Sequence, residues 1–196
     1  MTTNRTENQK PILRIYTDGA CSGNQNEKNI GGWGAILEFG PHQKELFGGE
    51  ANTTNNRMEM TALLEALSAI KKPSQTIEVF CDSSYLMDCF RKKWYVRWLE
   101  NGWMTSGKKP VENREIWEQL LPFLDEHHIT FYRVKGHISI DWHTKEDGTP
   151  DEHLWNTYKK FCEWNGNMFL YDDFAYITKM NNRADALANK GMDQYR

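Results

Sequence analysis

Three short strand-like runs, rich in apolar residues, occur between residues 11 and 50 of the chain, a pattern typical of β-strands. The first run ends at the pair Asp18-Gly19, a common turn signal. A Gly-Pro pair separates the second run from the third, as in a tight connection. We therefore predict a three-stranded meander built from residues 11–18, 31–39 and 44–50.

From residue 57 onward the apolar spacing becomes helical, and helical and strand-like stretches then alternate. Asn55 or Asn56 is placed to cap the first helix, at residues 57–70, and Pro122 should kink or split a later one. A meander followed by alternating helices and strands predicts an α/β fold with a five-stranded mixed sheet flanked by helices. The later elements are expected at residues 76–81 (strand), from about 83 (helix), 112–126 (helix), 129–134 (strand) and 183–190 (the start of a last helix).

The composition of the 196 residues, 39% of them hydrophobic, suits one core and a single domain at residues 11–196. The polar residues 1–10 are expected to be a disordered tail. No apolar run is long enough for a signal peptide or a membrane span, and the four cysteines form no CxxC pair. A cytoplasmic protein with free thiols and no membrane association fits these features.

The net charge of −3 is unfavourable for a nucleic-acid-binding protein until it is located along the chain. Residues 138–180 contain eight acidic and four basic residues and therefore carry −4. The remaining residues, with 19 acidic and 20 basic side chains, carry +1. The overall charge therefore does not exclude a nucleic-acid substrate.

Four acidic residues stand in distinctive settings, at the apparent ends of strands or helices: Asp18 in TDGACSGN, Glu59 in TTNNRMEM, Asp82 in FCDSSY and Asp185 in NNRADALA. Each alone has an ordinary explanation, since Asp before Gly often forms a turn and acids are favoured in the first turn of a helix. In mixed sheets, however, ligands collect outside strand ends, where Asp18 and Asp82 are expected, and Glu59 can face the same edge. Such concentrated negative charge is unstable unless it binds divalent cations, so the set predicts a metal-dependent nuclease.

These motifs, in this order and together with VKGH at residues 134–137, resemble the bacterial form of ribonuclease H type 1. The resemblance runs from about residue 12 to 134 and resumes near 181. It implies the RNase H-like fold and a monomeric enzyme that cleaves the RNA strand of RNA–DNA hybrids with Mg²⁺ or Mn²⁺, leaving a 5′-phosphate and a 3′-hydroxyl. By position, Asp18 should bridge two metal ions, Glu59 and Asp82 should hold one ion, and Asp185 the other. His137 should serve proton transfer or product release.

The resemblance also suggests residues that contact the substrate. Asn24, Asn55 and Glu59 match positions near the RNA 2′-hydroxyls. Thr54, Arg57 and Asn113 match positions near a phosphate of the DNA strand, although Thr54 and Asn55 are equally suited to helix capping.

Residues 91–110 match the basic protrusion of the family, with six basic residues and one acid around three tryptophans. Trp94, Trp98 and Lys108 are the expected contacts, with burial of Trp98 and Trp103 in the core as the alternative. The chain departs from the family pattern in two places, namely Leu99-Glu100-Asn101, where relatives often have a basic cluster, and Ser84, where bacterial members commonly have glutamine.

The 48 positions from His137 to Asp185 replace a loop of about ten residues in typical bacterial members, so residues 138–180 are expected to be an insertion. Its aromatic content argues against disorder, and Thr149-Pro150-Asp151-Glu152 resembles a capping box for a helix at 150–164 that packs by an aromatic face. The insertion is either a flap or wall beside the substrate, or an acidic surface for an unknown partner. A zinc site from His143, His153 and Cys162 has poor spacing.

Two other functions remain possible on this fold: an integrase-like or resolvase-like nuclease, and a non-catalytic hybrid-binding module. The TTNNRMEM and VKGH matches favour the hybrid-cleaving branch over the first. The intact set of four acids argues against the second, because a pure binder has no reason to concentrate negative charge near phosphates.

Overall fold

The computed structural model describes residues 12–23 and 29–195, and within them a five-stranded mixed sheet forms the centre of the molecule. The strand order is β3-β2-β1-β4-β5, with β1, β2 and β3 antiparallel and with β4 and β5 parallel to β1. The predicted fold class is confirmed; the expected tail at 1–10 and Asn24 lie outside the described residues. The strands are β1 Leu13–Ser22, β2 Ile30–Phe39, β3 His42–Ala51, β4 Thr76–Cys81 and β5 His128–Arg133.

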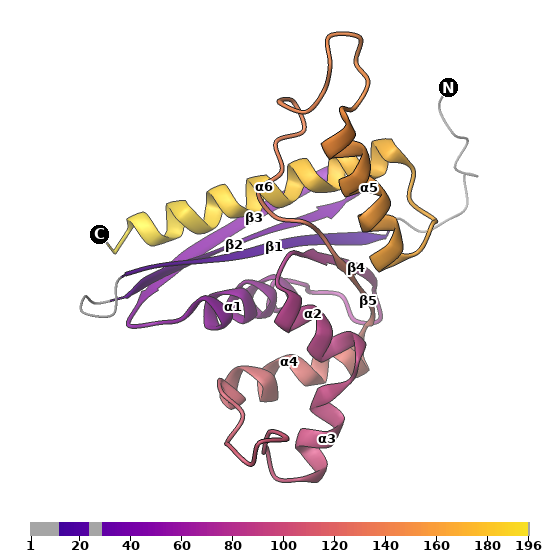
Figure 1. Cartoon of the computed structure of the whole chain (residues 1–196). Helices are drawn as coiled ribbons and strands as arrows, with labels where there is room; N and C mark the ends of the chain where they lie inside the picture. The colour runs from indigo at the N-terminus through magenta and orange to yellow at the C-terminus, as the bar shows by residue number, and fades with distance from the viewer. Residues whose placement is uncertain (1–11, 24–28, 196) are drawn as a thin grey trace.

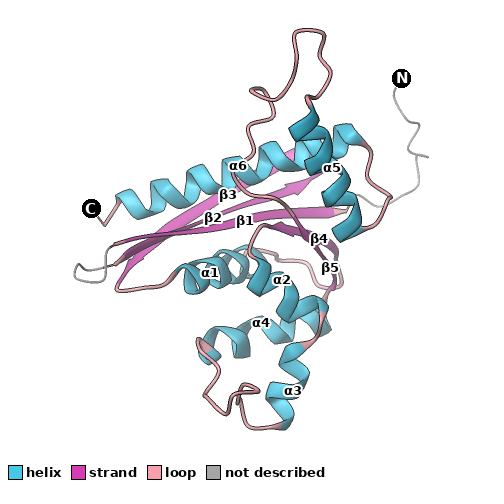
Figure 2. Cartoon of the chain, viewed as in Figure 1, coloured by secondary structure: helices cyan, strands magenta, loops and turns pink. Residues whose placement is uncertain are grey.

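Helices cover both faces of this sheet (Figure 1). Helix α6 lies along one face, α1 with α2 and α4 lies against the other, and α3 extends away from the sheet (Figure 2). Pro122 lies inside α4 without splitting it. No helix among the described residues combines the length and apolarity needed to cross a bilayer. The helices are α1 Asn55–Ser68, α2 Ser84–Arg91, α3 Trp94–Glu100, α4 Arg114–Glu126, α5 Glu152–Asn165 and α6 Tyr171–Asp193.

Alternation along the central strands divides the core into two clusters, one on each face of the sheet. Ile15 and Val79 belong to the cluster shared with α1, α2 and α4. Tyr16, Phe80 and Tyr132 point to the other face and stack with ring centroids 5.3 and 5.2 Å apart, against residues of α5 and α6. The sheet is therefore covered on both faces and positions its strand ends rigidly.

Strand β1 does not end at the predicted turn. It continues through Asp18, which pairs with Gly34, and on to Ser22. The glycine at position 19 serves close packing instead: a Cβ there would lie 2.4 Å from the backbone nitrogen of Glu59. The turn prediction was wrong because a glycine that admits a neighbouring helix looks the same in sequence as a glycine in a turn.

The last helix begins at Tyr171, 12 residues before the predicted start at Arg183. Asp185 therefore lies well inside α6 and not at its N-terminus. The helix continues through the Asn181-Asn182 pair because neither side chain caps it: Asn182 donates to the carbonyl of Ile138 at 2.7 Å, and Asn181 is buried with no hydrogen-bond partner for its side-chain amide. Sequence 138–180 is consequently no detachable unit, since the first two turns of α6 are part of the core.

Two helix starts also differ by a few residues from prediction. Thr54 caps α1 through its side chain, which places Glu59 in the second turn and not the first. Asp151, not Thr149, caps α5 by accepting a backbone N–H at 2.8 Å. Proline at position 150 therefore precedes the cap. In both cases a residue suited to capping is present, one or two positions away from the predicted cap.

Candidate active site

The four predicted carboxylates line one recess of about 350 Å³. Asp18 comes from the middle of β1, Glu59 from α1, Asp82 from the residue after β4, and Asp185 from α6. These elements come together although the residues are separated by up to 167 positions in the chain (185 − 18). Asn55, His137 and Asn189 line the same recess.

The register of the sheet brings the two aspartates together. Strands β1 and β4 are parallel neighbours in which Thr17 pairs with Cys81, so the next residues, Asp18 and Asp82, lie side by side. Glu59 reaches the two aspartates from α1, on one face of the sheet, because Gly19 has no side chain and lets α1 pack closely against β1. Asp18 and Glu59 are only 4% and 3% exposed.

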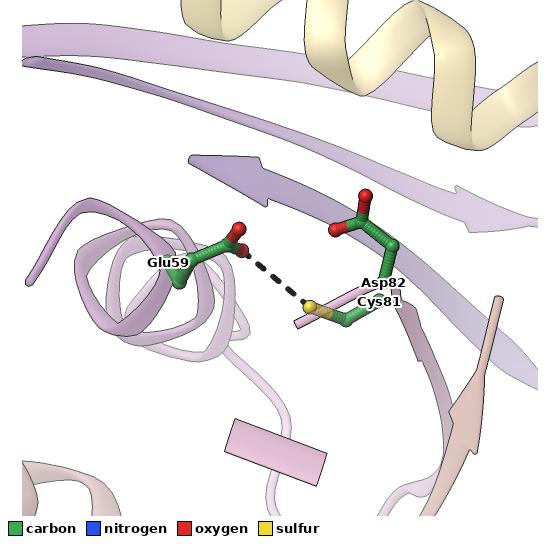
Figure 3. A group of neighbouring side chains, drawn as sticks. All are labelled: Glu59, Cys81 and Asp82. Atoms are coloured by element: carbon green, nitrogen blue, oxygen red, sulfur yellow. Dashed lines mark hydrogen bonds between the residues drawn. The ribbon is translucent and has the colours of Figure 1, made fainter. Parts of the chain in front are cut away.

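Figure 3 shows Glu59 extending from α1 toward Cys81 and Asp82. Potential ligand atoms of these three residues lie within 4.8 Å of one another, and no other such group of three occurs among residues 12–23 and 29–195. The thiol of Cys81 donates a hydrogen bond to Oε2 of Glu59 at 3.5 Å. The carboxylates therefore converge on a common volume.

Negative charge in this recess is not neutralised by the protein. Burial, followed by the charges of Asp82 and Asp185, raises the pKa of Asp18 to about 8, against a hydrogen bond from the backbone of Gly19 that lowers it. Burial, followed by the charges of Asp18 and Asp82, also raises the pKa of Glu59 well above its ordinary range. The pKa of Asp82 is raised by burial too, although the nearby His137 opposes this. Bound cations would relieve this repulsion.

The donor atoms suit a hard divalent cation. Oδ2 of Asp18 is buried and has no hydrogen-bond partner, so it is available as a ligand. The four carboxylates offer only oxygen, the ligand atom that Mg²⁺ and Mn²⁺ prefer. The residues therefore fit the implied metal ions.

His137 lies at the rim of the recess, on the loop after β5. Its backbone is left-handed (φ 57°), its side chain is 77% exposed, and its Nδ1 lies 3.9 Å from a carboxylate oxygen of Asp185. The loop passes close to Asp82, because a Cβ added at Gly136 would lie 2.0 Å from Oδ2 of that residue. The structure thus brings the predicted histidine to the carboxylates.

The predicted phosphate-contacting residues form one cluster beside the N-terminus of α1. Nη1 of Arg57 donates to the side-chain oxygen of Asn113 at 3.3 Å, and Arg57 also pairs with Glu50 at 3.2 Å and with Glu115. The side chain of Thr54 caps α1, so the capping alternative holds for this residue. A phosphate would have to share Arg57 with the two glutamates.

The basic protrusion contains both exposed and buried tryptophans. Trp94 is exposed, whereas Trp98 and Trp103 are buried in the core, with Trp98 5.3 Å from the ring of Trp117. Trp94 and one edge of Trp98 still line a recess of about 550 Å³. Lys108 is exposed but does not line that recess.

Two residues beside the carboxylates were not singled out from the sequence: Asn189, which lines the recess, and Cys81, which is buried and does not line it. Asn189 donates to Oδ1 of Asp185 at 3.1 Å, and its spacing of four positions in a helix is a signal that could have revealed it. Cys81 contacts Glu59, but a buried cysteine before an aspartate carries no such signal. The suggested zinc ligands do not gather: the rings of His143 and His153 lie 4.5 Å apart, but Cys162 is buried at the contact of its sulfur with the carbonyl of Phe169.

Solved structures with the same fold were found by comparison. LC9-RNase H1, described as a type 1 RNase H with the type 2 active-site motif, matches with a TM-score of 0.59 and 22% identity, over 90% of this chain and 87% of that one. LC11-RNase H1 in complex with an RNA/DNA hybrid matches with a TM-score of 0.53 and 17% identity, over 93% and 98%. At these identities the matches establish the fold.

The fold and the acidic recess together define the class of protein: an α/β protein with a centre of four carboxylates. Residues 10–154 match the family model described as RNase H. The ribonuclease H of Chlorobaculum parvum is 46% identical over 135 residues, which are 69% of this chain and 90% of the relative. The chain therefore belongs to the ribonuclease H family of hydrolases.

Proposed function

We propose that this protein is an endonuclease that hydrolyses the RNA strand of RNA–DNA hybrids by a two-metal-ion mechanism, leaving 5′-phosphate and 3′-hydroxyl ends. The observation that carries the proposal is the recess in which Asp18, Glu59, Asp82 and Asp185 meet, with an unpartnered buried oxygen of Asp18. The family membership supports the same activity, and a structural neighbour of the same fold is described in complex with an RNA/DNA hybrid.

In this proposal Asp18 would be shared by two Mg²⁺ or Mn²⁺ ions, of which Glu59 and Asp82 would hold one and Asp185 would hold the other. Asp18 is suited to bridging because its charge is near those of Asp82 and Asp185 alike. When bound, the ions would lower the pKa of the attacking water and stabilise the attacking and leaving oxygens of an in-line displacement. The protein contributes the fixed positions of its carboxylates, which come from two strands of a rigid sheet and two helices packed on it.

His137 would move a proton at its ring nitrogens, one of which is 3.9 Å from Asp185. Because the side chain is exposed, it can exchange that proton with solvent. Its loop position also allows it to assist product release. Asn189 would orient Asp185 through the 3.1 Å hydrogen bond.

Substrate would be held at both sides of the recess. Asn55 lines the recess itself and, with Asn24 and Glu59, is proposed to contact the 2′-hydroxyls. Arg57, with Thr54 and Asn113, would bind a phosphate of the DNA strand. In the protrusion, the exposed Trp94 and Lys108 are the proposed contacts, with the edge of Trp98 behind them.

The proposal includes a monomeric enzyme in the cytoplasm, where reducing conditions suit the four free cysteines. It also retains residues 138–180 as an addition to the usual family architecture. The family match ends at residue 154, and the aligned relative leaves 31% of this chain unmatched (100 − 69). The partner of residues 138–180, if their acidic side chains bind one, is unknown.

The test uses three labelled duplexes: an RNA–DNA hybrid, duplex RNA and duplex DNA. Each is incubated with the protein in Mg²⁺, in Mn²⁺ and in EDTA, and the Asp18→Asn variant is the control. We expect metal-dependent cutting of the RNA strand of the hybrid alone, lost in the variant. Hybrid binding without cutting in either metal would contradict the proposal and favour the binding-module alternative.

A further inference from the structure

Helix α5 presents three different faces. One face is buried against the core and another, with Glu152 and Glu163, is exposed and acidic. The third face carries side chains at positions 153, 156, 157, 160 and 164, which lie one turn apart along the helix (three or four residues, with 156 and 157 adjacent) and so form one stripe. With Lys135 this stripe lines a recess of about 210 Å³, called the α5 groove below; its lining residues are Lys135, His153, Asn156, Thr157, Lys160 and Trp164.

The α5 groove is basic although the surrounding segment is acidic. None of the described residues that line it carries a carboxylate, whereas Lys135 and Lys160 carry positive charge. Glu152, the acid next to His153 in sequence, lies on the exposed acidic face of α5, and Asp151 is engaged with His143 at 2.7 Å and in capping α5. The net charge of residues 138–180 therefore gives a misleading picture of this face.

The ring of Trp164 organises basic groups at the C-terminal end of the groove. The guanidinium of Arg133 lies 4.4 Å from the ring centroid and Nζ of Lys160 lies 5.4 Å from it. Arg91, the last residue of α2, donates to the backbone carbonyl of Trp164. Three cations from separate elements thus surround one residue of α5.

The position of α5 relative to the sheet is fixed at the same end. The side chain of Asn165 accepts from the backbone N–H of Arg133 at 2.8 Å and donates to its carbonyl at 2.7 Å. These two hydrogen bonds attach the C-terminal end of α5 to the last residue of the edge strand β5. The α5 side of the groove is therefore fixed to the sheet, and Lys135 lies on the loop that begins directly after the same residue, Arg133.

The groove adjoins the catalytic recess and the basic protrusion. Lys135 is followed directly by Gly136, which lies against the carboxylate of Asp82, and by His137 at the rim. At its other end the groove meets Arg91, the first basic residue of the protrusion. A polyanionic chain that leaves the catalytic recess on this side would pass over a continuous basic surface.

We propose that the α5 groove binds the sugar-phosphate backbone of the RNA–DNA hybrid next to the scissile phosphate; this rests on the proposed function. Lys135 and Lys160 neutralise phosphates, and the side chains of His153 and Asn156 donate hydrogen bonds to phosphate oxygens, while the hydroxyl of Thr157 donates to the carbonyl of His153 at 2.9 Å. The segment at 138–180 then acts as a wall on the substrate side.

The test compares two adjacent lysines of α5. Lys160→Ala removes a cation from the groove, whereas Lys159→Ala removes an equally exposed cation that does not line it. Binding of a fluorescent hybrid is measured by anisotropy in EDTA, where no cutting intervenes, over a series of salt concentrations. Circular dichroism and thermal unfolding verify the fold, and Lys160→Arg tests whether the charge restores binding.

Each neutralised phosphate contributes about 0.9 to the slope of the logarithm of the binding constant against the logarithm of the salt concentration. At 0.1 M salt, relative to 1 M salt, this contribution corresponds to about eightfold in affinity. We expect Lys160→Ala to lose about this much and to lower the slope by about 0.9, with Lys159→Ala changing affinity less than about twofold and Lys160→Arg close to the unaltered chain. If the two alanine variants bound the hybrid with equal affinity and equal salt dependence, the proposal that the α5 groove binds the hybrid would be overturned. Cutting of the same hybrid by the unaltered chain in Mg²⁺ is measured separately, so a failure of the groove is distinguishable from a failure of the proposed function.

Discussion

Replacing Asp18 with asparagine should stabilise the metal-free protein while it abolishes activity. Asp18 is buried beside Asp82 and Asp185, which raises its pKa from 3.8 to about 8. The folded state therefore binds more protons than the unfolded state between these values, and its stability falls as pH rises from about 4 to about 8. The asparagine variant lacks this titration.

The magnitude follows from the same two values. Between the ordinary pKa of 3.8 and pH 7, each pH unit lowers the free energy of unfolding by about 1.36 kcal/mol, which gives about 4 kcal/mol in total. Unmet hydrogen bonds of the new amide cost about 1–3 kcal/mol, which leaves a gain of about 1–3 kcal/mol. For a chain of this length, each kcal/mol shifts Tm by about 2–4 °C.

The assay is thermal unfolding of both proteins in EDTA at several pH values, with Asp125→Asn as the control at an exposed carboxylate. We expect Asp18→Asn to have the higher Tm at pH 8, by about 2–12 °C, and the difference to shrink toward pH 5. Added Mg²⁺ should stabilise the unaltered protein and reverse or reduce the gap, because the ion binds only the folded carboxylates. A variant that is less stable than the unaltered chain at every pH would refute the claim that repulsion dominates this recess.

Three further changes follow from the contacts of the site and of α5. His137→Ala should lower kcat for hybrid cleavage about 100-fold or more and leave Tm unchanged, since the side chain is exposed; a wild-type kcat would exclude it from proton transfer. Gly136→Ala should cost up to about 100-fold in cleavage, because its methyl would meet the carboxylate of Asp82, and unaltered kinetics would show that the loop yields freely. Phe161→Ala, at a fully buried position of α5, should cost about 3–5 kcal/mol in urea unfolding, whereas Trp155→Ala, 43% exposed, should cost about 1 kcal/mol; equal costs would contradict the observed packing.

Most of the fold was predictable because its strands carry clear alternation and its helices clear apolar stripes. The failures concern residues with two possible roles. Gly19 resembles a turn residue but admits α1, and the Asn181-Asn182 pair resembles a helix start but lies inside α6. In each case the deciding contact comes from an element distant in the sequence, which local patterns do not contain.

The carboxylates of the site were predictable because each stands in a distinctive local motif. The burial of Asp18 and Glu59 beside each other was not predictable. Glu59 was expected in the first turn of its helix, but it lies in the second turn, where it is buried. The basic face of α5 was also hidden, because net charge averages over a helix whose acids and bases occupy different faces. Surface properties of this kind require knowledge of which residues line the same groove.

The most direct measurement uses a DNA strand that contains a short internal stretch of RNA, paired with complementary DNA. In Mg²⁺, we expect cuts only within the RNA stretch, with products that carry 5′-phosphate and 3′-hydroxyl ends, and no cuts in EDTA or with Asp185→Asn. Cuts in the DNA portions, or undiminished cutting by Asp185→Asn, would contradict the claim that the four-carboxylate recess is a ribonuclease centre.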